Sequence, residues 1–134
     1  MLNILLVEDD EVDVMNVKRA FTKNHIANPL FTATDGVHAL EQLRSGGIPR
    51  ERRIVLLDLN MPRMNGIEFL RELRRDPELK STTVVVLTTS NDERDKVDAY
   101  DLNVAGYLLK PVTFSNFCEV MSALNRYWAL VELP

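Results

Sequence analysis

Five short apolar runs, each followed by a longer amphipathic or polar segment, constrain the fold of this chain more than any other feature. This alternation is typical of repeated strand–helix units, which form a parallel sheet covered by helices. The clearest run, Ile54-Val55-Leu56-Leu57, is apolar at consecutive positions, as a strand buried on both faces requires. The sequence therefore predicts an α/β fold with strands at 4–7, 30–33, 54–57, 84–87 and 107–109.

Helices are expected between these strands. Their predicted ranges are about 10–24, from 35 to the glycines at 46–47, from 65 to Pro77, 92–102 and 114–128. Asn65 and Glu68 have the spacing of a capping box, and Asp10 is placed to cap the first helix. The helix at 92–102 has only a thin apolar stripe, which predicts weak anchoring and freedom to shift. The charged segment 46–53 is expected to be a surface loop.

Length and composition favour one domain spanning 1–134, because 134 residues are too few for two independent cores. A formal charge of -4 gives no general electrostatic reason to bind nucleic acid or an anionic membrane. No apolar run approaches the ~20 residues of a membrane span. A single cysteine, Cys118, excludes an internal disulfide and is expected in the core. The expected location is the cytoplasm, with no nucleic-acid or membrane partner.

Polar residues stand where the predicted strands end. In a parallel sheet the carboxyl ends of the strands meet at one edge, which is where ligands bind in open α/β sheets. Three carboxylates there would repel one another by roughly 4 kcal/mol for each close pair. Protonation of one acid would relieve this repulsion, and so would a hard divalent cation such as Mg²⁺, which prefers oxygen ligands. The residues at this edge are Glu8, Asp9, Asp58, Thr88 and Lys110.

An aspartate, a metal ion, a hydroxyl and a lysine together fit phosphoryl transfer to a carboxylate. In this interpretation Asp58 is the nucleophile, and Asp9 and Asp58 bind Mg²⁺ together with the backbone carbonyl of Asn60. Glu8 holds a metal-bound water. Lys110 and Thr88 contact the phosphoryl oxygens, where a cation and a hydrogen-bond donor stabilise negative charge. Taken alone, Asp58 would be interpreted as an ordinary turn residue. Its interpretation as a nucleophile depends on the other four polar residues that are expected at the same edge of the sheet.

Five segments of the chain carry motifs: Leu6-Val7-Glu8-Asp9-Asp10, Leu57-Asp58-Leu59-Asn60-Met61-Pro62, Met64-Asn65-Gly66, Leu87-Thr88-Thr89 and Gly106-Tyr107-Leu108-Leu109-Lys110-Pro111. These motifs resemble those of response-regulator receiver domains of two-component signalling. They occur in the receiver order and with receiver-like spacing, and the resemblance runs from about Asn3 to Tyr127. It implies a flavodoxin-like (βα)5 doubly wound parallel sheet with strand order 2-1-3-4-5.

The same resemblance implies a stand-alone signalling phospho-acceptor, which catalyses only its own phosphoryl transfer and dephosphorylation and is not an enzyme for a separate substrate. The donor is the phosphohistidine of a sensor histidine kinase. Phosphorylation of Asp58 draws in the Thr88 hydroxyl and reorients Tyr107. The surface formed by the helix at 92–102, the fifth strand and the fifth helix then acts on a downstream protein.

A narrower resemblance is to the small receivers that serve bacterial phytochrome kinases. It rests on the extended loop at 46–53, the acids of the first helix and the apolar C-terminal extension at 128–134. Two interpretations of this extension are equally open. It forms a homodimer interface together with the surface of the helix at 92–102, the strand at 107–109 and the helix at 114–128, or it folds back on its own domain.

Two alternative functions compete with this interpretation. A Mg²⁺-dependent phosphatase of the haloacid dehalogenase type also uses an aspartyl nucleophile, but it needs a second Asp where this chain has Asn60. A flavin-binding module would need a phosphate-cradling loop after the first strand, where this chain has three acids. Turnover of a generic phosphate ester would favour the phosphatase, and a yellow purified protein would favour the flavin-binding module.

Overall fold

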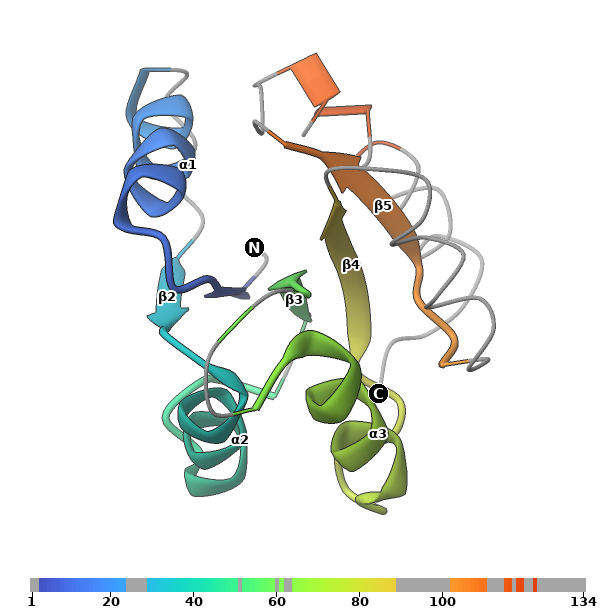
Figure 1. Ribbon diagram of the computed structural model, residues 1–134. Coiled ribbons are helices and arrows are strands. Elements are labelled where there is room, and N and C mark those ends of the chain that lie inside the picture. Colours follow the sequence, from blue (N-terminus) through green and yellow to red (C-terminus); the bar gives the residue numbers. More distant parts are fainter. Residues whose placement is uncertain are drawn as a thin grey trace.

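The computed structural model of the chain describes residues 3–23, 29–50, 52–59, 61, 64–88, 102–110, 115–116, 118–119 and 122. Five strands form one sheet in the order β2-β1-β3-β4-β5, and all neighbouring strands are parallel (Figure 1). The predicted fold class and strand order are therefore confirmed. The strands are β1 (Asn3–Val7), β2 (Leu30–Ala33), β3 (Arg53–Asp58), β4 (Thr83–Thr88) and β5 (Gly106–Leu109).

The apolar runs of β1, β3 and β4 form two cores, one on each face of the sheet. Successive side chains of a strand point to opposite faces. Accordingly, Leu5 and Val7 belong to one core, whereas Ile4 and Leu6 belong to the other. Every side chain from Ile4 to Val7 is fully buried, which explains why these strands lack the polar–apolar alternation of a half-exposed sheet.

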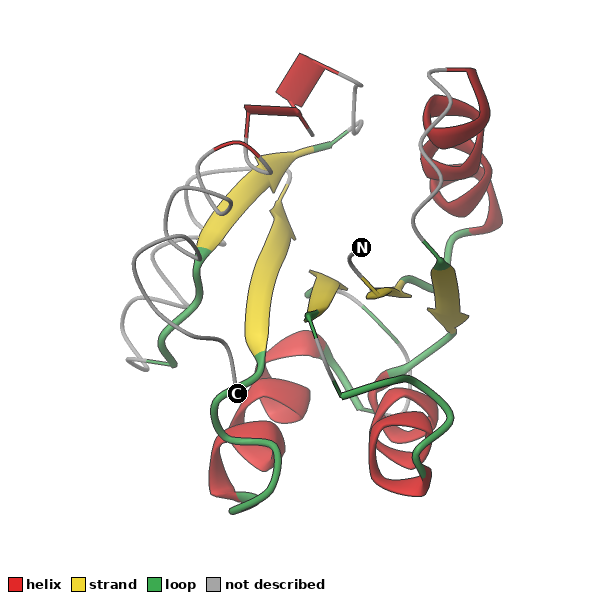
Figure 2. Ribbon diagram, turned by 180° about the vertical axis from the view of Figure 1, so that it is seen from behind, coloured by secondary structure: helices red, strands yellow, loops and turns green. Residues whose placement is uncertain are grey.

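Helices cover both faces of the sheet (Figure 2). The helices α2 (Gly36–Ser45) and α3 (Gly66–Arg75) lie side by side and supply Leu40, Leu43, Phe69 and others to one core. The helix α1 (Glu11–Lys23) packs on the opposite face through Val17 and Phe21. The sheet is thus doubly wound. The polar residues at the carboxyl ends of its strands lie between the two layers of helices.

The capping predictions are confirmed. Asp10 Oδ1 accepts hydrogen bonds from the backbone N–H groups of Val12, at 2.8 Å, and Asp13, at 3.3 Å. Asn65 and Glu68 form a complete capping box at the start of α3. These caps satisfy N–H groups that have no partner within the helix, and they fix where α1 and α3 begin beside the polar edge.

Gly66 brings the start of α3 against the end of β3. Its N–H donates to the carbonyl oxygen of Leu59 at 2.9 Å. A Cβ atom at this position would lie 2.6 Å from Leu59 Cα and 2.7 Å from the carbonyl oxygen of Asp58, distances that real Cβ atoms do not reach. Only glycine therefore allows α3 to pack this closely behind Asp58.

Arg74, near the end of α3, ties two loops to the helix. Its guanidinium donates to four backbone carbonyl oxygens: Lys80 at 2.9 Å, and Thr82, Leu102 and Asn103 each at 2.8 Å. The first two precede β4 and the last two precede β5. The planar, five-donor guanidinium suits this arrangement, which a lysine could not reproduce.

The segment expected to be a surface loop is exposed at most of its described residues, as predicted, but Ile48 is only 1% exposed and packs in the core. One expectation from the sequence was wrong. The side chain of Cys118 is exposed. It follows Phe117 of the predicted apolar stripe by one residue, which is about 100° around a helix.

The helix expected at 92–102 lies outside the described residues except for Leu102, which precedes β5 and is not helical. The described residues at 115–116, 118–119 and 122 are helical, in agreement with the fifth predicted helix. The rest of that helix and the extension at 128–134 lie outside the described residues. Within the described part of the chain, no helix has the length and apolar character needed to cross a membrane.

Candidate functional site

Three carboxylates meet at the carboxyl edge of the sheet. Glu8 and Asp9 follow β1, and Asp58 is the last residue of the neighbouring strand β3, whose Leu57 pairs with Val7. One carboxylate oxygen from each of the three residues lies within 4.8 Å of the other two. Glu8 is 2% exposed and Asp58 is 4% exposed, whereas Asp9 faces solvent. The predicted convergence of these three acids is confirmed as geometry.

Lys110 brings a positive charge into the cluster from the end of β5. Its Nζ atom lies 2.8 Å from Glu8 Oε2 and 2.9 Å from Asp58 Oδ1. Only 14% of the Lys110 side chain is exposed. Strong ion pairing is expected at these distances, because the surrounding protein screens charge less than water does.

The environment shifts the proton affinity of both Glu8 and Lys110. Burial raises the pKa of Glu8 from 4.5 to about 7, although the bonds from Lys110 and from the Asp10 N–H favour the charged form. Burial alone would lower the pKa of Lys110, but hydrogen bonds and charge attraction from Glu8 and Asp58 outweigh burial and raise it above 10.5. Lys110 therefore stays cationic, and Glu8 is the acid that gains or loses a proton near neutral pH.

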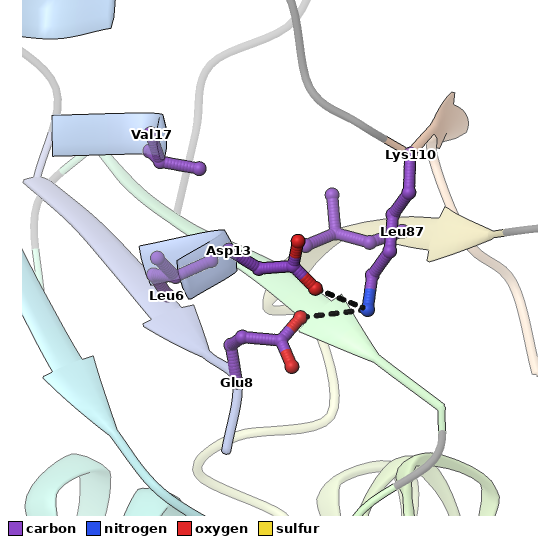
Figure 3. A pocket seen from close by; sticks show the side chains of 6 residues that line it. All are labelled: Leu6, Glu8, Asp13, Val17, Leu87 and Lys110. Carbon is purple, nitrogen blue, oxygen red and sulfur yellow. Dashed lines mark hydrogen bonds and ion pairs between the residues drawn. The ribbon is translucent and has the colours of Figure 1, made fainter. Parts of the chain in front are cut away.

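The structure adds Asp13, which was not among the site residues predicted from the sequence. Its Oδ2 atom lies 3.3 Å from Lys110 Nζ, and Figure 3 shows this contact beside that of Glu8. Together with Asp58, three carboxylates therefore surround one ammonium group. Asp13 is inside α1, where an acid in the first turn is readily explained by the helix dipole. A signal was present, because Asp13 stands one helical turn before the buried Val17 and therefore on the inward face of the helix.

The other predicted site residues are placed only in part. Thr88 ends β4 and pairs with Leu109 of β5, so its backbone lies at the same edge, but its side chain is outside the described set. Asn60 is also outside the described residues. Tyr107 is partly buried and packs against the core on the α2 and α3 face.

The donor set fits a divalent cation. Three carboxylates that share one site are the hard oxygen ligands preferred by Mg²⁺ and Mn²⁺. The exposure of Asp9 leaves one side of the cluster open to the water molecules that Mg²⁺ retains in protein sites. His38, the histidine that the structure describes, is not part of this group of ligands, and the cysteine, Cys118, is exposed and is not part of it either.

Residues 4–122 match the family described as the response regulator receiver domain. The chain belongs to this family. It shares 38% identity with the probable methanogenesis regulatory protein FilR2 of Methanothrix harundinacea, over 93% of this chain and 82% of that protein. It shares 36% identity with the response regulator Rcp1 of Synechocystis, over 98% of this chain and 92% of Rcp1. The resemblance to receivers found in the sequence is therefore confirmed.

Solved structures of response regulators, two of them phytochrome response regulators, have the same fold. The bacteriophytochrome response regulator RtBRR superposes with a TM-score of 0.84 at 36% identity, covering 100% of this chain and 85% of that chain. The phosphorylated cyanobacterial phytochrome response regulator RcpA gives a TM-score of 0.75 at 33% identity, covering 99% of this chain and 98% of RcpA. The Mn²⁺-bound form of Rcp1 gives 0.72 at 36% identity, covering 100% of this chain and 99% of Rcp1.

Proposed function

We propose that this receiver accepts a phosphoryl group on Asp58 from the phosphohistidine of a sensor histidine kinase, in a reaction that requires Mg²⁺. The observation that carries the proposal is the meeting of Glu8, Asp9 and Asp58 within 4.8 Å, with Lys110 Nζ 2.9 Å from Asp58. Two related receivers whose structures are solved, phosphorylated RcpA and Mn²⁺-bound Rcp1, support the same chemistry.

The reaction forms a bond between an Asp58 carboxylate oxygen and phosphorus as the bond between phosphorus and the histidine nitrogen breaks. Asp9 and Asp58 would hold the cation together with the backbone carbonyl of Asn60, and Glu8 would hold a water molecule bound to it. The cation neutralises charge that builds on the phosphoryl oxygens. Lys110 is already cationic and pairs with one of these oxygens, and Thr88 donates a hydrogen bond to another.

Phosphorylation would alter the surface that includes β5. In this proposal the Thr88 hydroxyl moves toward the phosphoryl group, Tyr107 reorients, and the helix at 92–102 shifts. Leu109 of β5 is 57% exposed on this edge of the sheet. A homodimer through β5, its flanking helices and the extension at 128–134 is one use of this surface, and a downstream target protein is the other.

The proposed kinase partner is a bacterial phytochrome. The support comes from the names of the related receivers RtBRR and RcpA, which are phytochrome response regulators. Mixing the receiver with a candidate phytochrome kinase and ATP, and following transfer of labelled phosphate, would test this pairing. The cytoplasmic location expected from the sequence stays a prediction.

Acetyl phosphate with Mg²⁺ tests the acceptor directly. Intact-mass spectrometry should show one labile phosphoryl group on the wild-type protein and none on Asp58→Asn. Asp10→Asn is the matched control, because it makes the same chemical change in a neighbouring acid and asparagine caps a helix as well as aspartate does. Undiminished phosphorylation of Asp58→Asn would refute the assignment, and sustained hydrolysis of a generic phosphate ester would point to a phosphatase instead.

A further inference from the structure

The ammonium group of Lys110 has three N–H donors and three carboxylate neighbours. Two of these neighbours, Glu8 and Asp58, are also part of the group of oxygens that fits a divalent cation. The third neighbour, Asp13, comes from α1 and contacts Lys110 at 3.3 Å. A cation at the cluster would therefore compete with Lys110 for Glu8 and Asp58, whereas Asp13 would remain available to the ammonium.

Among the described residues, the space around this contact offers the ammonium few other partners. Figure 3 shows the end of Lys110 directed toward Glu8 and Asp13, in a pocket that is also lined by Leu6, Val17 and Leu87. The free volume of this pocket is about 10 Å³, at most enough for a single water molecule. An ammonium group displaced from Glu8 and Asp58 could not be solvated fully here without Asp13.

We propose that Asp13 is a positioning residue, which holds the Lys110 ammonium from the α1 side while a divalent cation occupies the carboxylates of Glu8 and Asp58. This inference deepens the proposed function and rests on it for the role of the cation. Asp13 lowers the free energy needed to transfer the carboxylates of Glu8 and Asp58 from the Lys110 ammonium to the metal. It also keeps Lys110 within reach of a phosphoryl group on Asp58.

Asp13→Asn tests the proposal, because the substitution keeps the size of the side chain and removes its charge. In calorimetric titration with Mg²⁺, the dissociation constant should rise about three- to tenfold, as expected when a charged hydrogen-bond partner is lost. Glu11→Gln is the matched control: it removes an exposed charge from the same helical turn, and its dissociation constant should change by less than about twofold.

A double-mutant cycle separates an action through Lys110 from a direct action on the cation. In a Lys110→Met background, Asp13→Asn should alter the Mg²⁺ dissociation constant by less than about twofold. An undiminished effect in that background would show that Asp13 attracts the cation directly, and would overturn the positioning role. Equal effects of Asp13→Asn and Glu11→Gln in the wild-type background would overturn it as well.

A metal-free measurement tests Asp13 separately from the proposed function. The ¹H–¹⁵N signal of the Lys110 ammonium should be visible by NMR in the wild type and in Glu11→Gln. It should exchange with water about tenfold faster in Asp13→Asn, where a charged partner is missing. An unchanged exchange rate would overturn the inference even if the wild type binds Mg²⁺. A wild type that binds no Mg²⁺ would refute the proposed function, while the ammonium signal would still decide the role of Asp13.

Thermal unfolding of each variant identifies any loss of folding. If Asp13→Asn does not fold, Asp13→Ser provides the metal-free comparison, since serine keeps a polar side chain without the charge. Asp13→Glu should restore slow ammonium exchange, because it returns the carboxylate on a longer side chain. Failure of this variant to restore any protection would count against a role for the charge.

Discussion

Two cations, Lys110 and Arg74, lie in partly buried surroundings of opposite kinds. Lys110 is surrounded by the carboxylates of Glu8, Asp13 and Asp58. Arg74 is surrounded by four neutral backbone carbonyl groups and has no acid among its hydrogen-bond partners in the described residues. Burial lowers the pKa of Arg74, whereas for Lys110 the lowering by burial is outweighed by its acidic neighbours.

The difference separates a functional cluster from a structural one. Around Lys110, negative charge exceeds positive charge, so the cluster can take up a further cation. Around Arg74, four of the five guanidinium N–H donors are matched by neutral acceptors, and no further cation is favoured. Excess negative charge in a buried cluster is costly to the fold, and such a cost is typical of binding and catalytic sites.

Replacing Lys110 with methionine should cost about 4 kcal/mol of unfolding free energy at neutral pH without metal, because it leaves buried carboxylates without a counter-ion. Millimolar Mg²⁺ should restore most of this loss, since it neutralises the same carboxylates. Urea unfolding with and without Mg²⁺ measures both values. Equal destabilisation in the two conditions would contradict the idea of a shared carboxylate cluster.

Arg74→Met should cost about 3 kcal/mol, because it leaves four backbone carbonyl groups without their donors. Here Mg²⁺ should add only the stability that it adds to the wild type. The same urea experiment measures this difference. The contrast between the two cations would fail if Mg²⁺ rescued Arg74→Met as fully as Lys110→Met.

Glu8 should make the metal-free fold less stable as the pH rises. Its pKa is about 7 in the folded protein and 4.5 as an ordinary carboxyl group, so the folded state binds this proton more tightly. The resulting stability is present below about pH 4.5 and is lost as the pH rises through about 7, a change of about 3 kcal/mol.

Glu8→Gln isolates this effect, because the amide does not titrate. Melting temperatures measured from about pH 5 to pH 8 should fall in the wild type relative to Glu8→Gln. In the same range, Mg²⁺ should bind the wild type more tightly at higher pH and release protons on binding. If the melting temperatures of the two proteins changed with pH in the same way, Glu8 would not be the group that binds the proton in this pH range.

Arg50→Ala should give the smallest loss of unfolding free energy among these replacements of a cation. Arg50 forms an ion pair with Glu78 at 3.2 Å, and the two side chains are 57% and 70% exposed. Its removal should change the unfolding free energy by no more than about 0.5 kcal/mol, with or without Mg²⁺. A loss comparable to that of Arg74→Met would show that burial does not explain the difference between these cations.

Much of the fold could be predicted from the sequence because the strands are buried on both faces and read as continuous apolar runs. The acids at the site were predicted by the same reasoning, since Glu8 and Asp58 directly follow or end such runs. Strand order was available only through the resemblance to receivers, because the apolar pattern of a strand does not encode which neighbour it pairs with.

Asp13 and Arg74 could not be selected in this way, because a charged residue on an amphipathic helix is usually solvated. Both stand one turn from a buried apolar residue, Asp13 before Val17 and Arg74 after Leu70. Their partners are distant in sequence and are brought near only by the folded sheet. Asn60 and the Thr88 side chain stay predictions, and so does the proposed movement of the helix at 92–102.

The missing side chain at Gly66 gives Asp58 a mechanical support that carries no charge. Because α3 begins directly against the backbone of Asp58 and Leu59, no flexible side chain of Gly66 separates this helix from Asp58. A ligand or protein that tilts α3 could therefore adjust the reactivity of Asp58 from behind, without entering the acidic cluster.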